Sequence, residues 1–102
     1  MKARVVLRRA AELDLAAIED WYEAQEAGLG AEFRKAVGEL VDRIGDNPLA
    51  YPELYRRSRR AILRRFPYVV WYRIAGDSAI VLACVHGRRD PRLARARLQE
   101  GI

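Results

Sequence analysis

Eight residues in the second half of the chain have side chains that could act on a phosphate group. They are Arg59, Arg60, Arg64, Arg65, Tyr72, His86, Arg88 and Arg89. Guanidinium groups could stabilise the charge that develops on a phosphate during RNA strand cleavage, with His or Tyr as general acid or base. The simpler interpretation is that the arginines solvate the rim of a sheet or bind an acidic partner. Composition alone favours it, because solvated surface charge is common.

Other kinds of active site lack the residues they need. Cys84 and His86 are two positions apart on an expected strand and point the same way, but no further soft ligand for zinc lies nearby in the sequence. Ser58 and Ser78 fall in loop or turn contexts without the sharp elbow of a serine nucleophile. The apolar neighbours of Cys84 indicate a buried thiol in a reducing compartment. We expect no metal and no cofactor.

The elements that must position these residues are predicted to be three short strands. Phe66-Pro67 ends the first strand, because proline has no N–H for a ladder, and Gly76-Asp77-Ser78 ends the second. The predicted strands are Ala61–Leu63, Tyr68–Ile74 and Ala79–His86, in an antiparallel meander. Seven arginines are expected at the strand ends: Arg59, Arg60, Arg64, Arg65, Arg73, Arg88 and Arg89.

The first half of the chain is predicted to be one strand and a helical hairpin. Arg4–Leu7 is long enough for a strand only, and apolar residues then recur at three- and four-residue steps over about 10–27 and 31–44. Gly28-Leu29-Gly30 separates the helices, and Gly45 is expected to cap the second one. Residues 47–58 are interpreted as an ordered loop, and the segment after Pro91 as a short helix or tail. The predicted class is α+β.

Length and composition bound the function. The chain has 102 residues, of which 51% are hydrophobic, so we expect a single domain with one modest core. We find no run long enough to span a membrane and no signal peptide, and therefore expect a cytoplasmic protein. The formal net charge of +5 predicts an anionic partner, without choosing between nucleic acid and an acidic protein.

Four segments in order resemble a known family over about residues 10–91. They are AELDLAAIEDWYEAQEAGLGAEFRKAV, NPLAYPELY, RRAILRRFPYVVWYRI and VLACVHGRRDP. They are similar to the RelE/ParE superfamily of toxins from type II toxin-antitoxin modules, and most similar to its ParE-like branch, often called plasmid stabilisation proteins. The resemblance implies an N-terminal strand, a helical hairpin and an antiparallel sheet. It also implies a toxin that a cognate antitoxin neutralises.

The superfamily contains two mechanisms, and the motifs favour one. RelE-type members cut mRNA on the ribosome and carry an Arg in the motif Gly-Tyr-Arg-x-x-Tyr and a Tyr near the C-terminus. Here Val69 stands at that Arg position, and no Tyr follows Arg89. The resemblance therefore implies a ParE-like inhibitor that binds DNA gyrase without catalysis. The alternatives are a ribosome-dependent mRNA endonuclease that uses His86, Arg88 and Arg89, and an inactive family member that only binds its partner.

The expected partner is an antitoxin with an acidic, amphipathic segment. Such a segment could bury apolar side chains on the sheet and hairpin while its carboxylates meet the eight candidate residues given at the start. Ordering it on binding costs about 2–5 kcal/mol, so a large interface and a toxin-antitoxin hetero-oligomer are expected.

Overall fold

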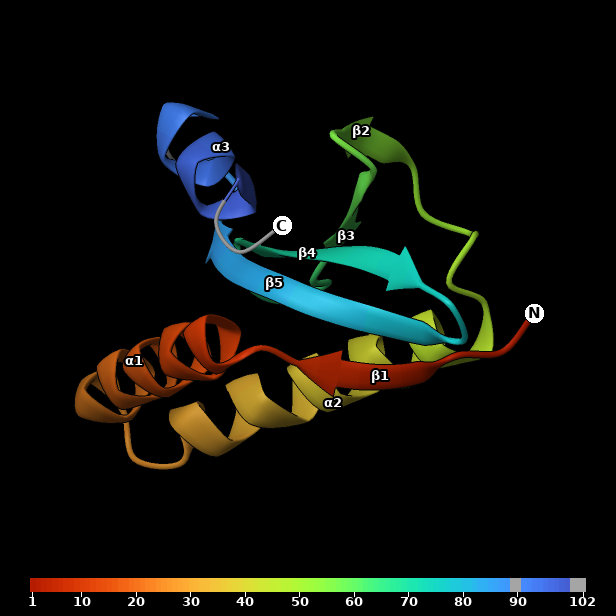
Figure 1. The fold of residues 1–102 in the computed structure, drawn as a ribbon. Helices are drawn as coiled ribbons and strands as arrows, with labels where there is room; N and C mark the ends of the chain where they lie inside the picture. Colours follow the sequence, from red (N-terminus) through yellow and green to blue (C-terminus); the bar gives the residue numbers. More distant parts are fainter. Residues whose placement is uncertain (89–90, 100–102) are drawn as a thin grey trace.

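The computed structural model describes residues 1–88 and 91–99 (Figure 1). Over these residues the chain forms five strands and three helices. Their bounds are β1 Arg4–Leu7, α1 Arg9–Gln25, α2 Leu29–Asp46, β2 Glu53–Tyr55, β3 Ser58–Ile62, β4 Tyr68–Ala75, β5 Ser78–His86 and α3 Pro91–Gln99. The predicted α+β class, with its N-terminal strand, helical hairpin, antiparallel strands and C-terminal helix, is confirmed.

The strands form one mixed sheet in the order β1-β5-β4-β3-β2. β1 runs parallel to β5, and the other neighbouring strands are antiparallel. β1 pairs only with the first part of β5, from Arg4 opposite Ser78 to Leu7 opposite Val81. Within the described residues, the outer edge of β5 beyond Val81 therefore has no neighbouring strand.

The helical hairpin turns through Gly28 and Gly30. Gly28 has a left-handed backbone with φ of 91°, and the carboxylate of Glu23 accepts the backbone N–H groups of Gly28 and Gly30 at 2.9 and 3.0 Å. A side chain on Gly30 would come within 2.8 Å of the Glu19 carbonyl oxygen. These glycines are therefore needed for a tight turn and for close approach of the two helices.

The second helix ends later than predicted. α2 continues through Gly45 to Asp46, and Asn47 is its C-cap. Gly45 serves a different purpose, because its carbonyl accepts the N–H of Ala3 and an added Cβ would lie 3.2 Å from the Ala3 carbonyl oxygen. The missing side chain lets the N-terminal segment pass close to α2.

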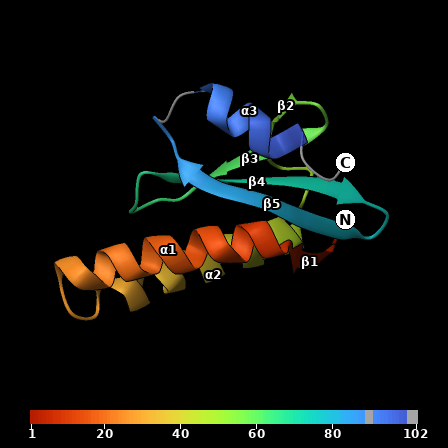
Figure 2. The ribbon, with the colours of Figure 1, turned by 60° about the vertical axis from the view of Figure 1, so that its left-hand side comes forward.

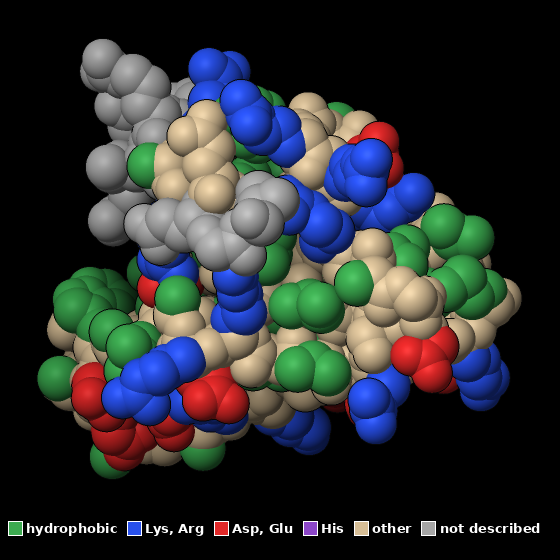
Figure 3. Space-filling view, in the orientation of Figure 1, with side chains coloured by type: hydrophobic (Ala, Val, Ile, Leu, Met, Phe, Trp, Pro, Cys, Tyr) green, Lys and Arg blue, Asp and Glu red, His purple; other side chains and the backbone are tan. Residues whose placement is uncertain are grey.

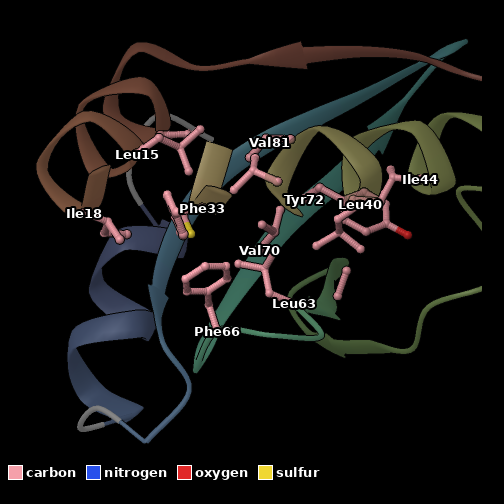
Figure 4. Close-up of a cluster of buried hydrophobic side chains, with 14 of the residues drawn as sticks. Leu15, Ile18, Phe33, Leu40, Ile44, Leu63, Phe66, Val70, Tyr72 and Val81 are labelled. Carbon is pink, nitrogen blue, oxygen red and sulfur yellow. The ribbon is translucent and has the colours of Figure 1, made fainter. Parts of the chain in front are cut away.

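The main core lies between the hairpin and one face of the sheet (Figure 4). Leu15 of α1 and Phe33 and Leu40 of α2 face Val70 and Val81 of the sheet (Figure 4). Each fully buried aliphatic side chain contributes about 1.5–3 kcal/mol by leaving water. This packing explains why two amphipathic helices fold onto strands rich in β-branched residues.

A second, smaller cluster covers the opposite face of the sheet. Val69 and Trp71 of β4 and Leu82 of β5 pack against Leu98 of α3, which is 1% exposed. The sheet therefore lies between two helical layers, with α1 and α2 on one side and α3 on the other (Figure 2). The C-terminal segment is a packed helix.

Two expectations for the strands are corrected by the structure. The predicted loop over residues 47–58 contains strand β2, so the antiparallel part of the sheet has four strands in the described chain. The next strand, β3, begins at Ser58, so Arg59 and Arg60 lie within β3 and not at its end. Arg73 likewise lies within β4. The predicted start was late because the charged arginines were placed at the end of the strand, whereas pairing with β4 determines the real boundary.

No helix among residues 1–88 and 91–99 is long and apolar enough to cross a membrane. Over the same residues, no three His, Cys, Asp or Glu side chains form a group that could hold a metal ion. Cys84 is a free, buried thiol, as predicted. Burial first, and the nearby Asp14 second, raise the pKa of the Cys84 thiol to about 12, so it is not a thiolate at neutral pH.

Tyr72→Phe should destabilise the fold. The Tyr72 side chain is fully buried and its hydroxyl donates a hydrogen bond to the Pro48 carbonyl, which fastens the segment after α2 to β4. The variant leaves that buried acceptor without a donor, so we expect a loss of about 1–2 kcal/mol in the free energy of unfolding. Urea denaturation followed by circular dichroism measures it. Tyr22→Phe is the control, and equal losses in both variants would contradict the role of the Pro48 contact.

Candidate functional site

A cleft remains where α3 covers only part of the outer face of the sheet. Its volume is about 240 Å³. Its lining residues are Leu54, Tyr55, Arg60, Val69, Trp71, Val85, His86, Gly87, Ala94, Arg95 and Leu98. They come from strands β2 to β5, the residue after β5, and α3, so the cleft exists only when α3 is docked.

Two arginines that line the cleft offer N–H donors, and the tryptophan beside them carries a buried N–H group. Arg60 is half-buried, and its guanidinium has no hydrogen bond or ion pair within the described residues. Trp71 is 8% exposed, and its buried Nε1–H has no hydrogen-bond partner among them either. Arg95 of α3 lies over the Tyr55 ring, with its guanidinium carbon 5.7 Å from the ring centroid. A ligand that supplies oxygen acceptors could bind the guanidinium groups of Arg60 and Arg95, whereas the Nε1–H of Trp71 is buried out of its reach.

The electrostatics of the cleft favour an anion. None of the described residues that line it is Asp or Glu, while Arg60 and Arg95 are cationic. The pKa of Tyr55 is lowered, first by the hydrogen bond that Gln99 donates to its hydroxyl and then by the nearby charges of Arg56 and Arg95. Lys and Arg side chains also gather over α3 and the neighbouring strands on this face (Figure 3). The cleft therefore suits a carboxylate or a phosphate beside an apolar group.

A turn of two arginines joins β2 to β3 beside the cleft. Arg56 and Arg57 both have left-handed backbones, with φ of 46° and 65°. This is the conformation of a type I′ hairpin turn, which usually contains Asn or Gly. The Arg73 guanidinium donates to the Arg56 carbonyl at 2.8 Å and holds the turn in place. The Arg56 guanidinium also lies over the Tyr55 ring, at 5.7 Å. Two arginines thus occupy a strained turn where other residues would be more stable.

Three of the predicted arginines make contacts within the fold. Arg59 donates to the Tyr51 carbonyl at 2.6 Å and fastens the loop before β2. Arg65 forms an ion pair with Glu32 of α2 at 2.8 Å. Arg73 supports the turn described above, and burial lowers the pKa of its guanidinium. Their charges remain, but their side chains have structural contacts.

The other predicted residues are divided between the two faces and one end of the sheet. Arg60 is the one Arg of the predicted set that lines the cleft in the described part of the chain. Arg64 and Arg88 are exposed. Arg89 lies outside the described residues. Tyr72 is buried in the main core on the opposite face, where burial raises the pKa of its hydroxyl to about 12, so we do not include it in the proposed surface.

His86 lies at the C-terminal end of β5, on the wall of the cleft. Its Nδ1 accepts the backbone N–H of Arg88 at 3.1 Å, so the neutral ring carries its proton on Nε2. The ring packs edge to face against Tyr68, with centroids 5.3 Å apart. The same end of the sheet is closed by a hydrogen bond from the Gly87 N–H to the Pro67 carbonyl.

Sequence reasoning missed Trp71, Tyr55 and Arg95 as parts of the site. The alternation along β4 could have identified Trp71, because Val70 and Tyr72 point to the main core and the residue between them points to the other face. Arg95 could not be found in this way, since its position depends on where α3 docks.

The docking of α3 depends on Asp14 of α1. Arg97 of α3 forms a two-point ion pair with this carboxylate, at 2.8 and 3.0 Å. The Asp14 carboxylate also accepts the backbone N–H of Cys84 at 2.9 Å, on the part of β5 that lies beyond β1. The side chains of Arg97 and Asp14 are only 26% and 17% exposed, so solvent screens the pair weakly. One carboxylate thus joins α1, β5 and α3.

Comparisons with known proteins agree with this fold. A family model described as the ParE toxin of the type II toxin-antitoxin system parDE matches residues 5–91. The chain is similar to a chain in the chromosomal ParDE toxin-antitoxin system of P. aeruginosa, with 22% identity, a TM-score of 0.63, and coverage of 83% of this chain and 96% of that one. It is also similar to a chain in the toxin-antitoxin complex RelBE2 of Mycobacterium tuberculosis, with 22% identity, a TM-score of 0.62, and coverage of 84% and 99%. No curated protein matches the sequence.

Asp14→Ala should loosen α3. The variant removes the two carboxylate oxygens that accept from Arg97 and leaves the Cys84 N–H without a partner. We expect the free energy of unfolding to fall by about 2–4 kcal/mol, since a weakly screened ion pair and a hydrogen bond are lost together. Relative to the parent protein, amide hydrogen exchange in Asp14→Ala should be accelerated more in α3 than in α2. Asp42→Ala on the exposed side of α2 is the control, and slow exchange of α3 in Asp14→Ala would contradict this role.

Replacing Arg56-Arg57 by Asn-Gly should stabilise the fold. Asn and Gly adopt left-handed conformations at lower cost, so we expect a gain of about 1–2 kcal/mol in the free energy of unfolding. The same change removes two cations beside the cleft and should weaken binding of a partner there. Replacing Arg64-Arg65 by Asn-Gly is the control with the same charge change, and it should not stabilise the protein. An equal free energy of unfolding for the Asn-Gly variant and the parent protein would show that the Arg56-Arg57 turn is not strained.

Proposed function

The chain belongs to the ParE toxin family of type II toxin-antitoxin systems, and we propose that it acts by binding and inhibiting DNA gyrase, without cutting a bond. The observation that carries this proposal is the chemistry of the cleft. It offers the cationic N–H donors of Arg60 and Arg95, and its described lining contains no carboxylate that could serve as a general base. Such a site recognises an anionic or acceptor-rich group and has few means to activate a nucleophile.

The position of Val69 supports a binding function. In the RelE-type motif an Arg occupies this position, whereas here Val69 is 6% exposed and packs in the cluster under α3. The residues after Arg89 contain no Tyr. Two of the groups that RelE-type enzymes use are thus replaced or absent, which favours the gyrase inhibitor within this family.

We propose that the cognate antitoxin covers the cleft with an acidic, amphipathic segment. Arg60 and Arg95 would pair with its carboxylates, because both guanidinium groups line the cleft. The apolar walls, Leu54 and Val85, would receive its apolar side chains. Leu54 is 50% exposed in the chain alone, so covering it adds apolar burial to the charge contacts.

The second candidate function is a ribosome-dependent mRNA endonuclease of RelE type. His86 favours it, because it lines the cleft and imidazole is the side chain best suited to exchange protons near neutral pH, and the adjacent Arg88 is exposed. Arg89 would complete the predicted set. The third candidate is an inactive family member that binds its partner only, and growth arrest on induction in cells would exclude it.

Purified toxin should inhibit DNA supercoiling by gyrase, and Arg60→Gln should weaken the inhibition. Losing a charge-assisted hydrogen bond in a partly buried cleft corresponds to about a tenfold or larger rise in the half-inhibitory concentration. Lys35→Gln, which removes the same charge from the exposed side of α2, should leave it unchanged. Unchanged supercoiling at saturating toxin would refute the gyrase proposal. Primer extension on mRNA from expressing cells tests the alternative, since codon-linked cuts that disappear in Arg88→Ala/Arg89→Ala would favour the endonuclease.

A further inference from the structure

The outward side of α1 carries a row of apolar residues at three- and four-residue steps. This row, which we name the α1 stripe, consists of Ala10, Leu13, Ala17, Trp21 and Ala24. The two large members, Leu13 and Trp21, are each 57% exposed. The buried residues of α1 lie on a different side of the helix and face α2 and the sheet. Apart from the edge contact of Trp21 with Tyr22, the large side chains of the α1 stripe lie outside the core and expose a large apolar area.

The charges beside the α1 stripe are separated along the helix. Arg9 lies at the N-terminal end of α1, while Asp20, Glu23 and Glu26 lie at the other end. Acidic side chains gather at the turn between α1 and α2 (Figure 3). A partner that covers the whole stripe must therefore carry acidic groups at one end and basic groups at the other.

We propose that the α1 stripe binds a second copy of this chain, with the two α1 helices antiparallel about a two-fold axis at Ala17. The midpoint of Leu13 and Trp21 is residue 17, so each Leu13 lies opposite the Trp21 of the other copy. Arg9 and Glu23 are on the same flank of the helix, eight and six residues from the axis in opposite directions. The remaining offset is about 3 Å of helix rise, which a long arginine side chain spans, so Arg9 of one copy can donate to a remaining lone pair of the Glu23 carboxylate of the other, which also accepts the Gly28 and Gly30 N–H groups. Every contact occurs twice, as a two-fold interface requires.

Other arrangements fit the charges less well. Parallel packing of two α1 helices would place Arg9 against Arg9 and Glu23 against Glu23, which is repulsive. An acidic segment would be repelled by Asp20 and Glu26 at the C-terminal end of α1. The small side chain of Ala17 also allows two helix backbones to approach closely at the axis, with the large side chains interdigitating on either side.

The size of the α1 stripe predicts a weak dimer. Fourteen residues of rise span about 21 Å, so one helix pair buries less than the roughly 1,200 Å² of a stable standard interface. We expect association in the micromolar range or weaker, in a surface that is separate from the cleft.

Sedimentation velocity of the purified toxin over a range of concentrations tests the dimer. The sedimentation coefficient should rise with concentration, and Leu13→Gln should raise the dissociation constant by about tenfold or more, since the change is made in both copies. Ile62→Gln is the matched control, because Ile62 is 59% exposed on β3. In the sheet order β3 lies two strands away from β5, the strand that α1 contacts. A toxin that stays monomeric at hundreds of micromolar, or equal effects of the two variants, would overturn the proposal.

Oxidative cross-linking tests the position of the axis. Ala17→Cys should form a disulfide-linked dimer, because the two residues meet at the axis, whereas Ala24→Cys should form much less. The native Cys84 is buried and should not interfere. Equal cross-linking of both variants would overturn the antiparallel arrangement. If instead the thiol introduced by Ala17→Cys reacts freely with a maleimide in the toxin alone and is protected only in the antitoxin complex, the α1 stripe belongs to the antitoxin and the proposal is wrong.

Discussion

The carboxylate of Asp14 is the contact on which the arrangement of the layers depends. It lies on α1, below the sheet, and it binds the β5 backbone at Cys84 and the guanidinium of Arg97 on the far side. A helix of nine residues such as α3 is marginal by itself in water. Its position is therefore determined by this ion pair and by Leu98, which packs on the sheet. The contact is possible because β1 is too short to cover the edge of β5 at Cys84.

The position of α3 divides the outer face of the sheet into a part that the helix covers and an open cleft. Leu82 lies in the part that α3 covers, Val69 lies there and also lines the cleft, and Arg60 lines the cleft with its donors unused. Trp71 belongs to both, because its ring packs under α3 and its Nε1–H is buried without a partner in the described chain. An unsatisfied buried donor costs the fold about 1–3 kcal/mol, whereas the donors of Arg60 remain available to a ligand in the cleft.

The spacing of apolar residues in the sequence predicted the sheet and the helical hairpin that covers it. It did not predict where the last helix docks. Apolar steps identified both hairpin helices, and turn residues identified β4 and β5. Strand β2 was missed because it has three residues, Glu53 to Tyr55, and pairs irregularly with β3. The number of arginines predicted a basic surface. It could not predict that Arg60 lines the cleft while Arg59, the preceding residue of β3, points to the other face of the sheet. Arg97 was not recognised because its partner, Asp14, is 83 residues away.

The separation of charge on this small molecule constrains how partners can approach it. The cleft and the Arg56-Arg57 turn are basic, whereas the turn between α1 and α2 is acidic (Figure 3). An acidic partner is attracted to the face with α3 and repelled from the tip of the hairpin, so its orientation is biased before contact. Such steering needs no catalytic group. It acts equally on an acidic antitoxin and on an acidic surface of the target, and the two would then compete for the same arginines. Under the proposed function, an antitoxin would neutralise the toxin through that competition, without any change in the fold of the toxin.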